Sequence, residues 1–382
     1  MPKMKFGDLV YNITEKRSPV PGDEELYIGL EHLDSGSLRV SRWGSKVELK
    51  GDKLKMEKGD ILFGRRNTYL RRVAIAPHDG LFSAHGMIFR AKTTCMDEDF
   101  LPFFLTSDYF MDEAIRISVG SLSPTVNWRE LKELEFDIPD IEMQQKLVQP
   151  LLAANELKEE YERLLSLTDE LVKSQFIEMF GDPIDNPMSW QKQQLQMLTT
   201  KDCSISYGIV KTGDDTPGGV PVFRPVDIVG KMPTVSELKR TTVEISNQYK
   251  RTLLTGRELL ITVRANIADT CIIGEEFTGC NVGRGIVPLR VDESIIRLEF
   301  LKSLIDFDSM NEHIKSKAKG TTLIQLNMED LRIIEFIIPP IAKQDEFIAF
   351  TKQSDKSKFE LKQNIENINA LMKSLMSQDF SS

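Results

Sequence analysis

The residues best suited to chemistry lie in the second half of the chain. Asp227 is followed by Glu237 and Lys239, which resembles the Asp…Glu-x-Lys pattern of many nucleases, where two carboxylates hold a divalent cation. The first half has Glu31 at the position matched to Asp227 but no corresponding Glu-x-Lys. Because such a triad is also common by chance, a nuclease is a minor alternative, and it predicts metal-dependent cleavage by this chain alone.

Other catalytic patterns do not emerge from the sequence. The glycine-rich segment 279–285 lacks the Lys-Ser/Thr of a phosphate-binding loop and the spacing of a dinucleotide-binding loop, so it is expected to be a turn. Pro339-Pro340 lies between isoleucines and does not match the Asn/Asp-Pro-Pro-aromatic motif of adenine methyltransferases. Neither the four cysteines nor the four histidines have metal-ligand spacing. We therefore predict no catalytic residue and no metal site.

Arginine, asparagine and tyrosine residues gather beside short β-like runs in both halves. Arginine and asparagine pair with two atoms of guanine and adenine edges, and arginine also holds phosphates. The predicted DNA contacts are Arg65, Arg66, Tyr69, Arg71 and Arg72 in the first half, and Arg224, Arg264, Asn266, Asn281 and Arg284 in the second. Glu31 and Asp227 can either accept from cytosine N4 or cap a turn.

An internal repeat of 200 residues organises the chain. Residues 100–180 align with residues 300–380 without a gap and are identical at 18 of 81 positions, where chance gives roughly five. The pairs that define the repeat include Gly120/Gly320, Asn127/Asn327, Pro139/Pro339, Gln144/Gln344 and Phe180/Phe380. Each half thus has a divergent region followed by a well-matched region, which predicts a pseudo-two-fold molecule.

The two kinds of region differ in periodicity. The divergent regions contain short β-like runs, such as 61–63, 73–76, 259–263 and 270–273, separated by Gly, Pro, Asp and Asn. In the matched regions, Asn127 and Asn327 are predicted helix N-caps with an acidic residue three positions later. A short strand ending at Pro139 or Pro339 and then a long helix are expected to follow.

Each long helix carries apolar residues spaced by threes and fours, which is typical of a coiled-coil seam. The predicted seam residues are Leu147, Leu151, Ala154, Leu157, Tyr161, Leu164, Thr168 and Leu171 in the first helix, and Phe347, Phe350, Ser354, Ser357, Leu361, Ile365, Ile368 and Leu371 in the second. A helix of about 40 residues is about 60 Å long. Two such helices in one chain are expected to pack antiparallel.

The net charge of −9 does not exclude DNA binding, because one segment holds the excess. Residues 130–182 carry 14 acidic and 5 basic side chains, which accounts for the whole imbalance. The longest apolar stretch, 333–341, is far shorter than the ~20 residues that a membrane span needs. The cysteines lack C-x-x-C pairs and are expected to be reduced thiols. We therefore expect a cytoplasmic protein.

Two modules held apart by stiff helices are suited to reading two sites at a fixed separation. DNA offers this geometry, since half-sites on one face of the duplex recur every ~34–36 Å. The modules differ while the helices match, as expected if each module reads a different half-site and the helices serve a common partner. The alternative from another class is a coiled-coil scaffold that links proteins without reading DNA.

Two motifs carry a resemblance to a known family. One is Phe176-Ile-Glu-Met-Phe-Gly-Asp-Pro183, which follows a long helix. The other runs from Gly320 through Leu326-Asn327 to Ile338-Pro-Pro-Ile-Ala-Lys-Gln344 and is repeated from Gly120 to Gln144, with Ser121-Leu122 for Thr321-Thr322 and Asp140 for Pro340. Together they resemble the specificity subunit of type I restriction–modification enzymes, over the whole chain and in the family's domain order.

The resemblance implies an α/β protein with two mixed target recognition domains separated by two long antiparallel helices. Its domains would be recognition domain 1 (1–129), a conserved spacer with long helix 1 (130–186), recognition domain 2 (187–329) and a conserved spacer with long helix 2 (330–382). Such a subunit is non-catalytic and recognises a bipartite DNA sequence. The resemblance also implies that two methyltransferase subunits and restriction/translocase subunits dock on it, and that these partners bind S-adenosylmethionine, ATP and Mg.

Overall fold

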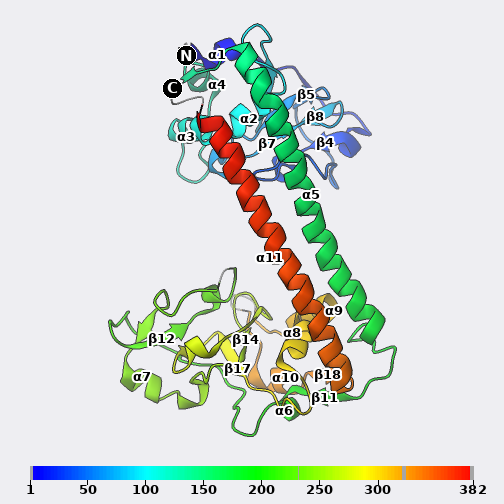
Figure 1. The fold of residues 1–382 in the computed structure, drawn as a ribbon, viewed down its shortest axis with the longest axis vertical. Coiled ribbons are helices and arrows are strands. Elements are labelled where there is room, and N and C mark those ends of the chain that lie inside the picture. Colours follow the sequence, from blue (N-terminus) through cyan, green and yellow to red (C-terminus); the bar gives the residue numbers. More distant parts are fainter. Residues whose placement is uncertain (1–2, 231, 321–323, 379–382) are drawn as a thin grey trace. The chain divides into compact units, whose positions relative to one another are not determined.

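The computed structural model describes residues 3–230, 232–320 and 324–378 (Figure 1). It divides into two compact units: unit 1 is Met1–Leu164 with Leu361–Ser382, and unit 2 is Leu165–Glu360. Both units combine short strands with helices, and each contains part of both long helices. This confirms the predicted fold class. The domain boundaries after residues 129, 186 and 329 were drawn from the repeat, and they stay a prediction.

Unit 1 is built on two four-stranded sheets and one two-stranded sheet, with the strand orders β2-β9-β6-β7, β3-β5-β8-β4 and β1-β10. The strands are β1 (Lys3–Lys5), β2 (Val10–Ile13), β3 (Lys16–Arg17), β4 (Tyr27–Ile28), β5 (Lys53–Met56), β6 (Ile61–Phe63), β7 (Val73–Ile75), β8 (Gly80–Phe82), β9 (Met87–Ala91) and β10 (Glu135–Asp137). The helices are α1 (Phe6–Leu9), α2 (Leu101–Thr106), α3 (Asp108–Arg116), α4 (Trp128–Leu131) and the start of α5 (Ile141–Phe180), with 3-10 turns at Leu30–His32 and Thr68–Leu70 among others.

Unit 2 repeats this plan with two three-stranded sheets and one two-stranded sheet, in the orders β15-β14-β17, β13-β12-β16 and β11-β18. The strands are β11 (Lys192–Gln194), β12 (Val220–Phe223), β13 (Arg240–Thr241), β14 (Leu259–Thr262), β15 (Thr270–Ile272), β16 (Asn281–Val282), β17 (Ile286–Leu289) and β18 (Glu335–Ile337). The helices are α6 (Leu195–Leu198), α7 (Val243–Asn247), α8 (Leu298–Asp306), α9 (Asp308–Ser316), α10 (Met328–Arg332) and the start of α11 (Ile341–Gln378), with a 3-10 turn at Pro225–Asp227.

The central strands are buried on both faces, and their side chains alternate between two hydrophobic clusters. In β6, Phe63 lies in the cluster that contains α2 and α3, whereas Leu62 lies in the cluster between the two sheets. In β14, Ile261 and Leu260 divide in the same way. Because successive side chains of a strand point to opposite faces, both units have the same layers of helices, sheet and second sheet.

A buried carboxylate stands at the start of the central strand in each unit. Asp60 precedes β6 and accepts a hydrogen bond of 2.5 Å from Nε of Arg90. Glu258 precedes β14 and lies 3.3 Å from Nη1 of Arg290. The bond to Asp60 raises the pKa of Arg90. Arg90 and Arg290 are 200 residues apart, so the repeat extends into the divergent region with its chemistry retained.

The long helices α5 and α11 confirm the predicted helical spacers. In unit 1 the start of α5 packs on the end of α11, and Leu151 and Met376 share one hydrophobic cluster. In unit 2 the end of α5 packs on the start of α11, where the rings of Phe176 and Phe347 meet edge to face with centroids 5.4 Å apart. Within each unit the two helical segments therefore run antiparallel (Figure 1).

The predicted seam of α5 is confirmed in part. Leu147, Leu151 and Ala154 are buried, and Lys158 outside the prediction is buried too, whereas Leu157, Leu164 and Leu171 are 46%, 44% and 52% exposed. The prediction for these three leucines was wrong. The buried face turns toward Lys158 because this side chain buries its aliphatic stem while its ammonium group finds a polar partner.

That partner comes from the segment between β4 and β5 of unit 1. Nζ of Lys158 donates a short hydrogen bond to the carbonyl oxygen of Gly36. In α11 the predicted seam residues Phe347, Ser354 and Ile368 are buried, whereas the prediction for Leu371, which is 52% exposed, was wrong. Within the described residues, no helix is long and apolar enough to cross a membrane.

A buried glutamine ties the first turn of each long helix to the domain before it. In unit 1, Oε1 of Gln144 accepts the backbone N–H of Asp97 at 2.8 Å. Its Nε2 donates to the carbonyl oxygens of Cys95 at 3.0 Å and Pro139 at 2.8 Å. The side chain has no exposed surface, so these three bonds satisfy backbone groups that water cannot reach.

Gln344 makes the same three bonds in unit 2. Its Oε1 accepts the backbone N–H of Arg297 at 2.8 Å, and its Nε2 donates to the carbonyl oxygens of Ile295 at 3.2 Å and Pro339 at 2.8 Å. The repeated Pro…Gln spacing therefore produces the same contact in both units. The two halves of the sequence match strongly around Gln144 and Gln344 because both glutamines make this contact.

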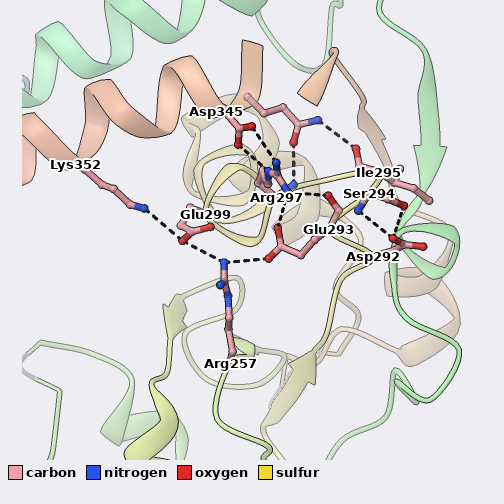
Figure 2. Close-up of polar contacts among 10 residues, drawn as sticks. Arg257, Asp292, Glu293, Ser294, Ile295, Arg297, Glu299, Asp345 and Lys352 are labelled. Atoms are coloured by element: carbon pink, nitrogen blue, oxygen red, sulfur yellow. Dashed lines mark hydrogen bonds and ion pairs between the residues drawn. The ribbon is translucent and has the colours of Figure 1, made fainter. Parts of the chain in front are cut away.

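The ion pairs around this contact are not shared by the two units. Figure 2 shows Arg297 bound to both carboxylate oxygens of Asp345, at 2.7 and 2.9 Å. Unit 1 has Asp97 and Gln145 at these positions and cannot form this pair. The glutamine, and not the ion pair, is the common element.

Replacing Gln144 by alanine would leave one buried N–H and two buried carbonyl groups without partners. We expect Gln144→Ala to lower the free energy of unfolding by about 2–4 kcal/mol in urea denaturation of the full chain. Gln145 lies next to it on α5 but is exposed, so Gln145→Ala is expected to change stability by less than about 0.5 kcal/mol. Equal effects of the two substitutions would contradict this account of the contact.

A second matched pair of substitutions tests which residues of α5 form the buried seam. Leu151 is fully buried, and Leu151→Ala is expected to lower the free energy of unfolding by about 2–4 kcal/mol. Leu157→Ala is expected to cost less than about 1 kcal/mol, because that side chain is half exposed. Urea denaturation curves of both variants give the two free energies of unfolding. The observed seam would be refuted if Leu157→Ala lowered the free energy of unfolding more than Leu151→Ala did.

Candidate nucleic-acid interface

Three loops of unit 1 meet at one end of its sheets. They are residues 29–32 after β4, residues 64–72 after β6 and residues 83–86 before β9. The backbone N–H of Ser83 donates to the carbonyl oxygen of Ile28 at 3.0 Å, and Nη1 of Arg72 donates to the carbonyl oxygen of Leu30 at 3.0 Å. We name this region the loop end of unit 1, with its first, second and third loops in chain order.

Unit 2 has an equivalent loop end, formed by residues 224–227, 263–269 and 283–285. The backbone N–H of Gly283 donates to the carbonyl oxygen of Phe223 at 2.8 Å. A Cβ atom on Gly285 would lie 2.5 Å from Cγ of Pro225 and 3.5 Å from Cβ of Arg264, so this glycine allows the three loops to approach closely. Each loop carries one predicted arginine, namely Arg224, Arg264 and Arg284.

The first loop of each unit is closed by the last residue of its 3-10 turn. In unit 2, Oδ2 of Asp227 accepts the backbone N–H of Arg224 at 2.7 Å and binds its Nε at 3.0 Å. In unit 1, Nδ1 of His32 accepts the backbone N–H of Gly29 at 2.9 Å, and burial lowers the pKa of His32. The turn cap is one of the two roles predicted for Asp227.

The matching of Glu31 with Asp227 was wrong by one residue. Each unit contains one parallel strand pair, in which Ile28 lies opposite Phe82 and Phe223 lies opposite Val282. These registers align Ile28 with Phe223, and His32 then becomes the counterpart of Asp227. Glu31 is exposed beside the cap.

Arg66 and Arg264 occupy equivalent positions in the second loops. Both form an antiparallel backbone bridge to a neighbouring segment, Arg66 with Thr125 and Arg264 with Gln325. Arg66 is exposed, with Nη2 at 3.3 Å from Oγ of Ser123. Arg264 is half-buried, and its Nε donates to Oε1 of Gln325 at 2.6 Å. The same backbone frame thus presents an arginine at each loop end.

The segment behind these arginines contains the repeated glycines. Gly120 and Gly320 have φ angles of 113° and 124°, which residues with side chains rarely adopt. Val119 and Thr125 exchange two backbone hydrogen bonds of 3.1 and 2.9 Å, and the equivalent pair in unit 2 does the same at 2.9 and 3.0 Å. The repeated phrase therefore builds a tight loop that supports the arginine. Residues 321–323 of this phrase lie outside the described residues.

Two predicted arginines of unit 1 hold the loop end together. Arg71 binds Oδ1 of Asp108 through Nη1 at 2.5 Å and Oδ1 of Asp112 through Nη2 at 2.6 Å. Arg72 binds the first loop through the carbonyl oxygen of Leu30, as described above. Both guanidinium groups are therefore engaged within the protein by short bonds, whereas the exposed guanidinium of Arg66 makes one longer bond of 3.3 Å to Ser123.

The remaining predicted residues differ in their access to solvent. Tyr69 in unit 1 and Asn266 and Arg284 in unit 2 are exposed at the loop ends. Arg224 is also exposed, although its guanidinium binds Asp227. Nε of Arg65 is buried and has no hydrogen-bond partner among the described residues.

Asn281 is placed in the core of unit 2. Its Oδ1 accepts from Oγ1 of Thr252 at 2.7 Å, and its Nδ2 donates to Oγ of Ser246 at 3.0 Å and to the carbonyl oxygen of Tyr249 at 3.3 Å. The side chain has no exposed surface. Because a buried amide satisfied in this way offers nothing to a nucleic acid, Asn281 is not part of the candidate interface.

The nuclease-like residues do not form a metal site. Oε2 of Glu237 accepts the backbone N–H of Thr234 at 2.6 Å, and Nζ of Lys239 donates to the carbonyl oxygen of Gly213 at 2.7 Å. Asp227 caps its own turn. Across residues 3–230, 232–320 and 324–378, no group of three or more His, Cys, Asp and Glu side chains could hold a metal ion.

A basic and aromatic segment of unit 1 was missed in the sequence. Arg42 binds both oxygens of Asp34 and the carbonyl oxygen of Glu31 in the first loop, at 2.7–2.8 Å. The exposed ring of Trp43 packs edge-on against His78, with centroids 5.0 Å apart. The signal was the interleaving of cations with an aromatic residue, in Arg39, Arg42, Trp43, Lys46 and Lys50.

Four leucines of α5 are exposed, and we name them the leucine strip. Leu157 and Leu164 lie in unit 1, and Leu167 and Leu171 lie in unit 2. Exposed leucines that gather on one helix are typical of a surface that binds another protein. The acidic residues that gave this segment its negative charge flank the strip, including Glu156, Glu160, Asp169 and Glu170.

Comparison with known proteins finds a matching family model and similar proteins. Residues 208–370 match the model of the family described as type I restriction modification DNA specificity domain. The specificity subunit of the type I restriction enzyme EcoBI of Escherichia coli is 24% identical over 198 residues, which are 51% of this chain and 42% of that protein. The chain therefore spans less than half the length of this relative.

Solved structures show the same fold. The S subunit of a type I restriction–modification system from M. genitalium has a TM-score of 0.56 at 13% identity and covers 100% of this chain and 96% of that one. A chain from a study of complex assembly and conformational transition of the type I R-M system has a TM-score of 0.52 at 17% identity, covering 99% and 97%. Residues 208–370 therefore match the model of type I restriction modification DNA specificity domains, and the resemblance of this chain to type I specificity subunits is confirmed.

Proposed function

We propose that this chain is the sequence-specificity subunit of a type I restriction–modification complex and reads a bipartite DNA target, one half with each loop end. The observation that carries the proposal is the equivalence of Arg66 and Arg264. The same backbone bridge presents both, in modules whose other loop residues differ. A shared frame with different side chains suits two different half-sites.

The exposed side chains have the chemistry that base reading needs. Arginine recognises guanine through two acceptors and asparagine recognises adenine in the same manner. Unit 1 offers Arg66 and Tyr69, whereas unit 2 offers the exposed Asn266 and Arg284 and the half-buried Arg264. Because the two sets differ, the two halves of the target are expected to differ in sequence.

The helices serve the partners in this proposal. The leucine strip of α5 is the surface on which modification subunits dock, and the complex then recruits restriction/translocase subunits. S-adenosylmethionine, ATP and Mg are bound by these partners, and this chain contributes recognition without catalysis. The complex acts on double-stranded DNA in a prokaryotic cytoplasm.

Selection from random duplex DNA tests the proposed function. The chain would be purified with a candidate modification subunit and used to enrich bound sequences. We expect one two-part motif, bound with an affinity that falls linearly with the logarithm of salt concentration. A stable complex that enriches no motif would support the scaffold alternative instead.

Single substitutions at the equivalent arginines should affect the two halves separately. We expect Arg66→Ala to relax the base preference in one half of the selected motif by about 1–3 kcal/mol and to leave the other half unchanged. Arg264→Ala should do the reverse, so that each variant is the control for the other. A uniform loss across both halves would contradict base reading by these arginines.

The spacing between the two halves is expected to depend on the helices. Seven residues inserted after Leu164 and seven after Glu360 keep the heptad register and lengthen each helix by about 10 Å. The gap in the selected motif should then grow by about three base pairs. An unchanged gap would refute the role of the helices as a spacer.

A further inference from the structure

In each unit, a lysine–aspartate ion pair joins one long helix to the recognition domain. In unit 1, Nζ of Lys373 on α11 lies 2.5 Å from Oδ2 of Asp108 at the start of α3. In unit 2, Nζ of Lys173 on α5 lies 2.8 Å from Oδ2 of Asp308 at the start of α9. Both partners recur at a distance of 200 residues, so the pair belongs to the internal repeat.

Among the described residues, this pair continues to the loop end in unit 1 but not in unit 2. Asp108 binds Lys373 with one carboxylate oxygen and Arg71 of the second loop with the other, both at 2.5 Å. Arg71 also binds Asp112 at 2.6 Å. These charges form a continuous chain from α11 to the loop that carries Arg66.

The counterpart of Arg71 in unit 2 has no charge. Arg71 and Ala268 both stand two residues before an edge strand, β7 or β15, and both have positive φ angles, 48° and 68°. The carbonyl oxygen of Ala268 accepts a hydrogen bond of 3.1 Å from Nδ2 of Asn311 on α9. The second loop of unit 2 is thus held by a neutral contact that does not involve Lys173.

The ion pairs of Arg71 hold a backbone conformation that is unfavourable for this residue. A left-handed backbone at a residue with a side chain is unfavourable and persists only where the surroundings hold it. Arg71 is held by Asp108 and Asp112, and Lys373 holds Asp108 in turn. The bonds from Lys373 and Arg71 lower the pKa of Asp108.

We propose that Asp108 is a positioning residue that couples the second loop of unit 1 to α11 through Arg71 and Lys373, and that unit 2 lacks this coupling. A partner that displaces Lys373 when it binds α11 would then loosen the loop that carries Arg66. The loop end of unit 2 would be unaffected by the same event at Lys173. The consequence for DNA reading rests on the proposed function, whereas the coupling itself does not.

Amide hydrogen exchange of the full chain measures the coupling without DNA. The backbone N–H groups of Leu70 and Arg71 are bonded within the second loop, to Asn67 at 2.9 Å and Thr68 at 2.8 Å, and report on its opening. Lys373→Met keeps the length of the side chain and removes its charge. We expect this variant to speed exchange at these amides about two- to fivefold, the size of effect expected from losing an exposed ion pair.

Matched variants separate coupling from general loosening. Lys173→Met removes the equivalent pair in unit 2 and should leave the exchange of the Ala268 amide, bonded to Thr262 at 2.9 Å, unchanged. Lys373→Arg should restore the slow exchange of the unit 1 loop. Unchanged exchange in Lys373→Met, or equal acceleration of the unit 2 loop in Lys173→Met, would overturn the proposal. Because the readout uses no DNA, its failure is distinguishable from failure of the proposed function.

Discussion

The structure depends on two buried glutamine side chains. Each long helix begins where a recognition domain ends, and this junction buries an N–H group and two carbonyl groups that have no partner in helix or sheet. Gln144 and Gln344 satisfy all three groups in their units, with bonds of 2.8–3.2 Å. A buried backbone group without a partner is costly, so the junction admits few other side chains. The helix start and its domain are thereby held as one body within each unit.

On this frame the two loop ends were free to diverge. The tight loops of Gly120 and Gly320 and the bridges to Arg66 and Arg264 are common to both, while the turn caps differ, with His32 in one and Asp227 in the other. The backbone thus fixes where side chains project, and the side chains differ in what they can recognise. Specificity located in loops on a shared scaffold is a common arrangement in binding proteins.

The features predicted from the sequence are those with a local or repeated signal. The β runs and the long helices followed from periodicity, and the correspondence of the two halves followed from the repeat. The later part of the α5 seam did not, because two adjacent apolar stripes fit the same spacing and a buried Lys158 decides between them. Two other features depend on contacts between residues far apart in the sequence. One is the register of the parallel strands, which makes His32 the counterpart of Asp227. The other is the burial of Asn281 among Thr252, Ser246 and Tyr249.

The central claim is that two modules in one chain read the two halves of one target. The most direct measurement is a methylation map of host DNA after this chain is co-expressed with a candidate modification subunit. The account predicts adenine methylation at one two-part motif, which disappears when either module is deleted. Methylation at a single uninterrupted motif, or a stable complex without sequence-restricted methylation, would contradict it.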